Sequence, residues 1–417
     1  MPPTRIHRPH DSKWMAFFKP LIGGDRDPVN YTSLRIPGTA GITNVTLYSV
    51  ALIGMAIIVL LLLGGCAPGS EEPEAAKAPG VPANWTDEGF LRADRPRKFS
   101  FPQDHGPHQG YRTEWWYVTG NLEGPDKRRF GYQITLFRIA LTPEQPDLNA
   151  SHWRASHVWM AHLALTDIGA KKHYHQERFS REALGLAGAQ SDPLSIWVEE
   201  WKLYHGGPLS PWRLSAGTNE FSLELELEPM RKPVLQGEEG LSRKGGGAGN
   251  ASYYYSITRL ATSGKLKLGG QIFPLKGLSW LDREWSTSAL AETQAGWDWF
   301  SLQLDEGSDL MFYRLREKSG STSPQSAGII FRGDGTLLKL ASDDVILSAR
   351  RWWKNPRGVR YPVVWEVTVK PLQRRFIIEA SFDDQEMDLS VRYWEGAVVV
   401  NEAGARIGQG YLELTGY

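Results

Sequence analysis

Beyond residue 96, apolar and polar side chains alternate along the chain with a period of two residues. The stretch FSLELELEP (Phe221–Pro229) does so without a break, as expected of a β-strand with one wet face. The same alternation recurs in Gly131–Leu141, Lys265–Leu275, Val363–Pro371 and Arg375–Phe382. Turn sequences such as EGPDK, DEGSD and RGDGT fall between such runs. The sequence therefore predicts a mostly β protein. Its best helix candidate is the short segment Ser180–Gly188.

Two hairpin sequences resemble each other. WYVTGNLEG (Trp116–Gly124) and WFSLQLDEG (Trp299–Gly307) match at an offset of 183 residues, and each leads through an acidic-Gly turn into a second aromatic-rich strand. This similarity indicates two related β domains in tandem, although two hairpins can also converge on common strand chemistry. We place the domains at residues 96–287 and 288–417, with the Gly-rich stretch Gly237–Ser252 as a long loop inside the first.

The apolar segment Val50–Gly65 runs directly into Cys66, the only cysteine of the chain. Small residues before Cys66 fit a bacterial lipobox, which predicts cleavage of a signal peptide and acylation of the cysteine; the alternative is that residues 50–66 remain as a membrane-spanning helix. Residues 67–95, rich in Pro, Ala and Glu, are predicted to be a tether. Residues 1–49 form a tail to which we assign no function. We expect an exported, membrane-anchored lipoprotein, located in the periplasm or at the outer membrane if the cell is Gram-negative.

The charge balance and the histidine spacing exclude several classes of function. The 47 Lys and Arg residues equal the 47 Asp and Glu residues, so no overall basic field indicates a nucleic-acid partner. No phosphate-binding loop or serine-hydrolase elbow occurs, and we predict no cofactor. A metal site built from His105, His108 and His157 is conceivable. However, the tight ligand spacing typical of such sites is missing, and we predict no metal.

The first candidate site lies in FPQDHGPHQGYRTEWWYVTG (Phe101–Gly120), which is crowded with charged and aromatic residues. In an extended strand, Glu114 and Trp116 face one way while Trp115 and Tyr117 face the other. A carboxylate beside indoles in a barrel mouth would have a raised pKa because burial disfavours its charged form, and it could then give up a proton. The alternative is a salt-bridged strand end.

The second candidate site is SWLDREWS, which places two carboxylates next to each other. In an extended strand, Asp282 and Glu284 lie on one face, about 6–7 Å apart, while Arg283 and Trp285 project to the opposite face. Such a pair can divide into acid and base roles if the two environments differ. It can equally pin the two domains together through arginine partners, and the sequence leaves both interpretations open.

The third candidate site lies in GWDWFSLQL and the following MFYRLR. These strings supply Asp298, Tyr313 and Arg314. Tyr and Arg on a barrel strand can hydrogen-bond a polar group of a ligand, but arginines on strands are more often solvated or paired.

These motifs together resemble one known family. FPQDHGPHQGYRTEWWYVTG, HQERFSREALGLAGA, GLSWLDREWSTSAL with GWDWFSLQLDEGSDLMFYRLR, and the closing YWEGAVVV and GYLELTGY are similar to the AttH-like/carotenoid 1,2-hydratase (hydroxyneurosporene synthase) family, over about Lys98 to Tyr417. The resemblance implies two lipocalin-like antiparallel β-barrels in tandem.

The resemblance also implies a chemistry. Hydratases of this family add water to a terminal isoprenoid double bond: an acid protonates the alkene, aromatic faces stabilise the carbocation, and water is captured. Asp282, Glu284 and Glu114 are then the candidate catalytic residues. The candidate ligand-binding residues are Trp116, Trp285, Asp298, Trp299, Tyr313, Arg314, His105 and His108.

We therefore expect a protein that binds a hydrophobic small molecule and acts on it as a hydratase or hydrolase. The alternative is a non-catalytic carrier of lipids at the cell envelope, with an envelope transporter as its partner. An enzyme needs a carboxyl group that points into a cavity, away from any arginine. A carrier would pair its carboxylates at a rim and leave an apolar interior. Export argues against a carotenoid as the substrate itself.

Overall fold

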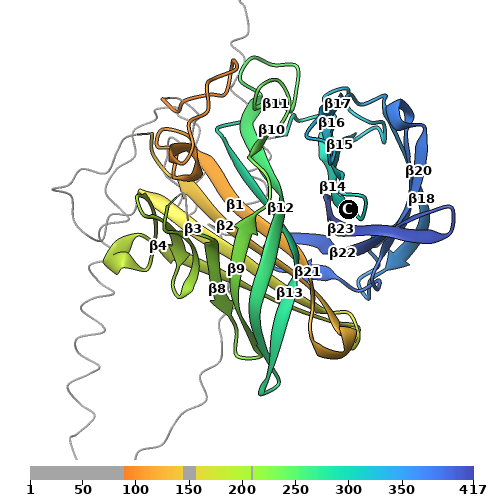
Figure 1. Ribbon diagram of the computed structural model, residues 1–417. Helices are drawn as coiled ribbons and strands as arrows, with labels where there is room; N and C mark the ends of the chain where they lie inside the picture. The colour runs from red at the N-terminus through yellow and green to blue at the C-terminus, as the bar shows by residue number, and fades with distance from the viewer. Residues whose placement is uncertain (1–88, 144–155, 208–209, 289) are drawn as a thin grey trace, which may run out of the picture. The chain divides into compact units, whose positions relative to one another are not determined.

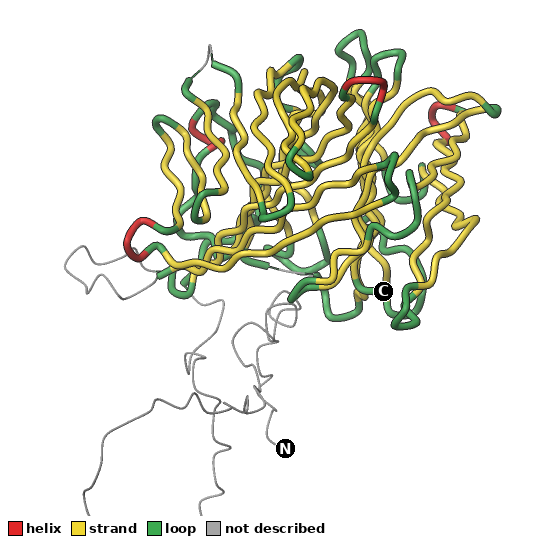
Figure 2. Tube along the Cα trace, turned by 90° about the horizontal axis from the view of Figure 1, so that it is seen from below, coloured by secondary structure: helices red, strands yellow, loops and turns green. Residues whose placement is uncertain are grey.

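The computed structural model describes residues 89–143, 156–207, 210–288 and 290–417. Nearly all of the regular structure in these ranges is strand, arranged in two antiparallel sheets (Figures 1 and 2). The predicted tail, the segment with Cys66 and most of the predicted tether lie outside the described residues. Within the described ranges, no helix has the length and hydropathy needed to cross a bilayer.

The strands of the first sheet are β1 Thr113–Glu123, β2 Arg129–Ala140, β3 His157–Asp167, β4 Lys172–Arg181, β5 Ala187–Ser191, β6 Leu194–Val198, β7 Trp201–His205, β8 Trp212–Gly217, β9 Phe221–Pro229, β10 Val234–Leu235, β11 Leu241–Arg243, β12 Ala251–Leu268 and β13 Gln271–Ser286. Their order in the sheet is β4-β3-β2-β1-β13-β12-β9-β8-β7-β6-β5, with β10 and β11 paired to β12.

The strands of the second sheet are β14 Gln294–Leu304, β15 Asp309–Glu317, β16 Ala327–Phe331, β17 Leu337–Leu340, β18 Val345–Lys354, β19 Arg360–Val369, β20 Arg374–Ala380, β21 Glu386–Asp388, β22 Arg392–Glu402 and β23 Ala405–Thr415. Their order is β17-β16-β15-β14-β23-β22-β20-β19-β18, with β21 paired to β22. Four short 3₁₀ turns complete the regular structure: η1 Gln103–His105, η2 Pro125–Lys127, η3 Ala183–Gly185 and η4 Lys370–Leu372.

The two sheets share one pattern of strand pairing. The first strand pairs with the second and with the last, as β1 does with β2 and β13, and β14 with β15 and β23. One sheet forms a nearly closed barrel and the other a half-barrel, so the prediction of two tandem lipocalin-like barrels is confirmed. Because successive side chains of a strand point to opposite faces, apolar side chains fill the interior of each barrel. A third apolar cluster, with members from both sheets, lies between the two sheets.

Both of the similar hairpins are present in the structure, but residues that match in the sequence lie on opposite faces of their strands. Trp116 lies in the interior of the first barrel, whereas Trp299, its match at offset 183, lies in the cluster between the sheets. Phe300, one residue later, fills the second interior. Because neighbouring residues on a strand face opposite sides, an alignment that is off by one residue pairs opposite faces.

Two local predictions differ from the structure. The predicted helix at Ser180–Gly188 is wrong: β4 ends at Arg181, and only the turn η3 separates it from β5. Leu184 adopts φ 60° and ψ 18°, a left-handed conformation that ends any right-handed helix. The predicted loop Gly237–Ser252 contains β11, which pairs with the start of β12.

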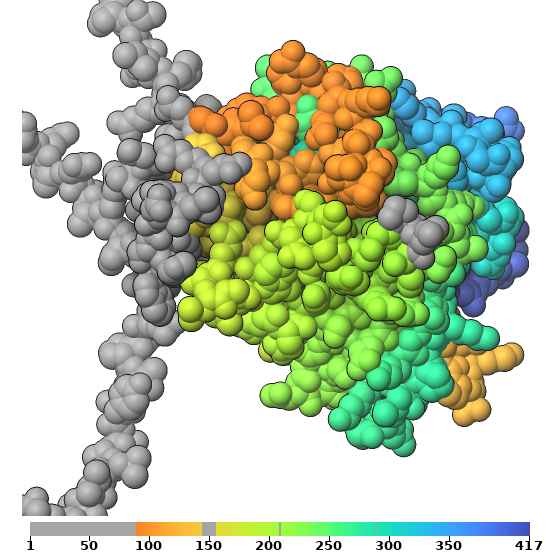
Figure 3. Space-filling view, turned by 60° about the vertical axis from the view of Figure 1, so that its left-hand side comes forward, coloured from red at the N-terminus to blue at the C-terminus, as the bar shows by residue number. Residues whose placement is uncertain are grey.

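The segment that precedes β1 packs against the first sheet. Phe99 lies 5.5 Å from the ring of Trp285, and the backbone oxygen of Arg95 accepts a hydrogen bond of 2.9 Å from the hydroxyl of Tyr253. In Figure 3 the orange part of the chain, to which this segment belongs, lies on the surface beside the yellow-green part. The segment thereby covers the aromatic side chains at this end of the first barrel.

Candidate functional site at the junction of the sheets

A cavity of about 130 Å³ lies between the two sheets, and we call it the junction cavity. Its walls are the outward faces of β1, β2, β3, β12 and β13 on one side and of β14, β15, β22 and β23 on the other. Most of its aromatic lining consists of Trp115, Tyr117, Phe137, Tyr254, Trp297, Trp299, Tyr313 and Tyr393. Four carboxyl groups and one ammonium also line it, contributed by Asp282, Glu284, Glu395, Glu413 and Lys244.

Asp282 lies in the cavity wall on β13 and is held by hydroxyl and indole groups. Its carboxylate accepts hydrogen bonds from the hydroxyl of Tyr254 (2.6 Å), the hydroxyl of Ser256 (2.5 Å) and the indole N–H of Trp280 (2.7 Å). Burial raises the pKa of Asp282 to about 7, although these three donors favour the ionised form. This carboxyl group can therefore both hold and release a proton near neutral pH.

Glu284 lies two residues further along the same face, as the alternation predicted, and it is paired. The ammonium of Lys244 lies 3.1 Å from its Oε1, and the hydroxyl of Ser252 donates a hydrogen bond to the same oxygen. Burial alone would lower the pKa of Lys244, but the negative charge of Glu284 raises it above its ordinary value. Asp282 and Glu284 thus have different environments: one has neutral donors, the other a cation.

Glu395 and Glu413 enter the cavity from the second sheet. They are direct cross-strand partners on β22 and β23. The hydroxyl of Tyr117 donates to Oε1 of Glu395, and the indole of Trp297 donates to Glu413 over 3.2 Å. Burial, together with the charge of Glu413, raises the pKa of Glu395 well above its ordinary value. Burial also raises the pKa of Glu413, to about 8. Two buried carboxylates opposite each other repel, so the pair retains protons at neutral pH.

The third candidate group divides between the two faces of its strands. Trp299 and Tyr313 line the cavity: the indole of Trp299 donates to the hydroxyl of Tyr254 (3.1 Å), and the hydroxyl of Tyr313 lies 2.8 Å from that of Ser242. Asp298 and Arg314 do not line it. They form an ion pair of 2.6 Å, and the guanidinium of Arg314 lies over Trp365 in the interior of the second barrel.

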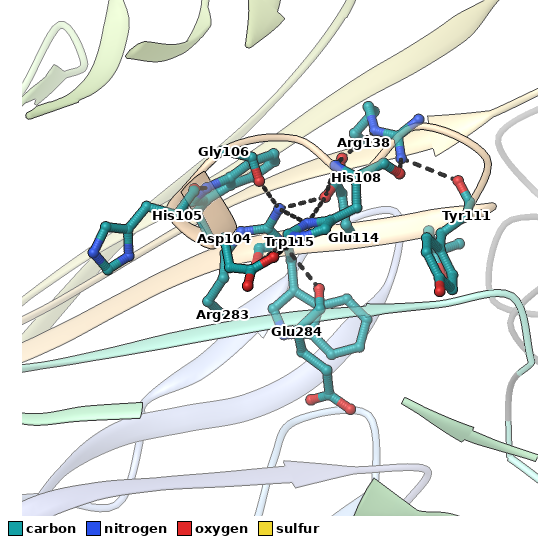
Figure 4. A network of polar contacts seen from close by, with 12 residues as sticks. Asp104, His105, Gly106, His108, Tyr111, Glu114, Trp115, Arg138, Arg283 and Glu284 are labelled. Atoms are coloured by element: carbon teal, nitrogen blue, oxygen red, sulfur yellow. Dashed lines mark hydrogen bonds and ion pairs between the residues drawn. The ribbon is translucent and has the colours of Figure 1, made fainter. Parts of the chain in front are cut away.

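Glu114 lies outside the junction cavity, in a buried network inside the first barrel. Arg138 and Arg283 both donate to its carboxylate, and the backbone N–H of His108 donates over 3.0 Å. Figure 4 shows these groups together, with the carboxylate of Glu284 pointing away from them. The expected rise in the pKa of Glu114 is wrong. Burial would raise this pKa, but the two guanidinium charges hold it well below its ordinary value.

Four of the predicted ligand-binding residues belong to this same network and not to the cavity. The guanidinium of Arg283 lies 3.8 Å from the ring of Trp116, and the ring of His108 stacks on Trp285 at 3.6 Å. His105 lies 2.6 Å from the hydroxyl of Tyr255, and burial lowers its pKa to about 3. These contacts hold together the inner face of β13 and the segment before β1, so they form a structural clasp.

The histidines considered as metal ligands have other partners. His108 pairs with Asp104 at 2.9 Å, and His157 pairs with Glu182 at 2.6 Å. In the part of the chain that the structure describes, no group of three His, Cys, Asp or Glu side chains is arranged to hold a metal ion.

Sequence reasoning missed three charged residues of the cavity. Glu395 and Glu413 are isolated glutamates in the apolar closing strings YWEGAVVV and GYLELTGY, and that isolation is a signal that could have identified them. Lys244 lies in the Gly-rich stretch Gly237–Ser252, for which the sequence predicts a loop. Its contact with Glu284 depends on β11, which immediately precedes it and pairs with β12.

The comparisons with known proteins cover the whole described body. Residues 92–417 match the protein family described as AttH-like. A protein assigned as AttH from Nitrosomonas europaea has a crystal structure that is similar with a TM-score of 0.72 and 36% identity, covering 79% of this chain and all of that one. Kievitone hydratase from Nectria haematococca is similar with a TM-score of 0.58 and 14% identity, covering 79% of this chain and 96% of that one. No curated protein matches the sequence.

Proposed function

The chain belongs to the AttH-like family, and we propose that its junction cavity binds a hydrophobic small molecule, isoprenoid or lipid-like, and adds water to it with acid assistance. The proposed acid is Asp282, and the proposed walls are the aromatic side chains around it. The fold shared with kievitone hydratase, a protein named as a hydratase, is compatible with this chemistry.

The observation that carries the proposal is the environment of Asp282. Within the described residues, its hydrogen-bond donors are Tyr254, Ser256 and Trp280, and no arginine or lysine is paired with it. Burial raises its pKa to about 7. A carboxylic acid matched to neutral pH, in an aromatic cavity and without a cationic partner, meets the requirement for an enzyme stated above.

The proposed reaction balances as an addition of water. The O–H bond of protonated Asp282 breaks as its proton forms a C–H bond with the less substituted alkene carbon. The positive charge then rests on the more substituted carbon, where the faces of Trp299 and Tyr313 stabilise it. Water forms the C–O bond and returns a proton to the Asp282 carboxylate. The acid therefore ends in the state in which it began.

A non-catalytic carrier is the second candidate, and the pairing of Glu284 favours it. This carboxylate is neutralised by Lys244 at 3.1 Å, as expected of a group that stabilises the wall of an apolar binding site. In a carrier, Asp282 would only anchor the polar end of a ligand.

The test uses the full chain from its own host and an organic extract of the same cells, incubated in water labelled with heavy oxygen. We expect wild type, and the matched variant Glu386→Gln with its change outside the cavity, to convert an unsaturated compound into a product one labelled water heavier. Asp282→Asn should bind the unsaturated compound without converting it. If all three proteins retain the same compound without converting it, the protein is a carrier and the proposal of an enzyme is refuted. If none retains or converts any compound, the binding role is refuted.

We also propose that residues 50–66 direct export and that Cys66 is acylated, which would anchor the protein to a membrane. The position of the sole cysteine directly after the apolar segment supports this. Labelled palmitate should enter the wild-type chain and not Cys66→Ala. Equal labelling of both would refute acylation at this residue.

A further inference from the structure

The junction cavity has an excess of acidic groups that its own residues do not neutralise. Of its four carboxyl groups, Glu284 is paired with Lys244, and His162 in the same wall has a pKa lowered by burial. Among the described residues, Asp282, Glu395 and Glu413 have no arginine or lysine partner. The cavity therefore disfavours an anionic ligand and can accept positive charge.

One acceptor atom in the cavity is unused. Oε1 of Glu395 accepts from Tyr117, whereas its Oε2 is buried and has no hydrogen-bond partner of good geometry among the described residues, although the nearby hydroxyl of Tyr393 also stabilises the ionised carboxylate. The residue is 1% exposed and lines the cavity. A buried carboxylate oxygen without a donor is costly, so this atom is available to a donor or a cation from a ligand.

Another part of the cavity wall already holds an ammonium group in the way a ligand would be held. The Nζ of Lys244 lies 4.3 Å from the ring centroid of Tyr313 and 5.4 Å from that of Tyr254, with Glu284 as its counter-charge. Glu395 and Glu413 likewise lie among aromatic side chains of the cavity lining, and among the described residues no lysine is paired with them.

We propose that the junction cavity binds a hydrophobic organic cation, an amine or quaternary ammonium, whose positive charge lies against Glu395 and Glu413 and the aromatic walls. The inference rests on the proposed binding role of the cavity and names the class of ligand. A carbocation formed during hydration would benefit from the same charge distribution.

Binding of a cation must release a proton from the glutamate pair. Titratable side chains from both sheets face the glutamate pair. The first sheet and the stretch after β11 contribute Tyr117, His162, Lys244, Asp282 and Glu284, and the second sheet contributes Tyr393 and Tyr411. Lys244 is the one cation among them and is already paired. Since burial raises the pKa of Glu413 to about 8, the pair is protonated near pH 7, and an incoming cation favours its ionised form. Affinity for the cation should therefore rise with pH and level off above about pH 8.

The test is isothermal titration of the full chain with choline as the probe and neohexyl alcohol as its neutral isostere, in which carbon replaces nitrogen. We expect choline to bind at least about tenfold more tightly. We also expect about one proton to be released per choline bound, which is measured by repeating the titration in buffers of different ionisation enthalpy.

Two variants test whether choline binds at the pair Glu395 and Glu413. Glu413→Gln should abolish the proton release and weaken choline at least about tenfold while leaving neohexyl alcohol unchanged. Glu386→Gln, a change at a buried glutamate of the second sheet outside the cavity, should behave as wild type. The titrations of wild type test the preference for a cation even if Glu413→Gln fails to fold.

Four outcomes overturn the inference. Equal binding of choline and neohexyl alcohol, or choline binding without proton release, refutes the cation preference alone and leaves the proposed hydrophobic binding standing. Failure of both probes to bind refutes the inference together with the binding role on which it rests. Unchanged choline binding by Glu413→Gln places the cation site elsewhere.

Discussion

Replacing Asp282 with Asn should make the protein more resistant to urea than wild type at neutral and alkaline pH, and this advantage should shrink in acid. The reason is the burial of a group that must ionise. In the folded protein, burial raises the pKa of Asp282 from 3.8 to about 7. In the unfolded chain the carboxyl group is solvated and loses its proton near its ordinary pKa.

The magnitude follows from the difference between the two states. Because the raised pKa means that the folded state binds the proton more tightly, the stability due to this group is complete below about pH 4. It falls as pH rises and is lost above about pH 7. Three pH units at about 1.4 kcal/mol each give a loss of about 4 kcal/mol in the wild type. Asn does not ionise, so Asp282→Asn does not lose this stability as pH rises.

The assay is urea unfolding of the full chain at a series of pH values. The free energy of unfolding of Asp282→Asn minus that of wild type should grow by about 1.4 kcal/mol per pH unit between about pH 4 and pH 7, then level off. Thr135→Val, which lines the same cavity and keeps every carboxyl group, should shift stability by the same amount at each pH. Parallel curves for wild type and Asp282→Asn would show that the buried carboxyl group does not hold its proton, and the argument for Asp282 as the acid would fail.

Three further changes test the surroundings of the cavity. Glu114→Gln leaves two arginines buried without their counter-charge and should lower the free energy of unfolding by about 3–5 kcal/mol; a loss under about 1 kcal/mol would contradict the clasp. Arg259→Met removes one of the two arginines that bind Asp309 across the sheets (2.7 Å), and it should cost about 3 kcal/mol, seen in the same urea assay; wild-type stability would refute this link. Trp299→Ala removes an aromatic wall and should cost about 3–5 kcal/mol and weaken choline binding at least about fivefold; unchanged choline affinity would exclude this face from the cation site.

The faces of the strands could be predicted from sequence because strand geometry is local. A period of two residues places Asp282 and Glu284 on one side and Arg283 and Trp285 on the other, and the structure has this arrangement. The partners of these residues could not be predicted in the same way. Glu114 meets one arginine 24 residues away and another 169 residues away, and the pairing of β1 with both β2 and β13 brings the three together.

The glutamate pair shows how a local irregularity can hide a site. Counting back along the hairpin of β22 and β23 from its closing pair, Glu402 and Ala405, an ideal ladder would place Glu395 opposite Leu412. A register shift next to Val400 moves the pairing by one residue, so Glu395 lies opposite Glu413 and both glutamates face the junction cavity. A β-bulge of this kind redirects side chains and is not visible in the alternation of apolar and polar residues.

Strand β13 joins the structural clasp to the proposed site, because its two faces serve different purposes. On the inner face, Arg283 is fully buried between Glu114 and the ring of Trp116, which fixes the strand within the first barrel. Asp282 is the residue next to Arg283, so its backbone is held in place as well, and its side chain faces the junction cavity from the outer face. The carboxyl group of the proposed acid must be held in position by the surrounding structure, and the clasp supplies that support one residue away. Loss of the clasp should therefore disturb the cavity, whereas Asp282→Asn should leave the clasp intact.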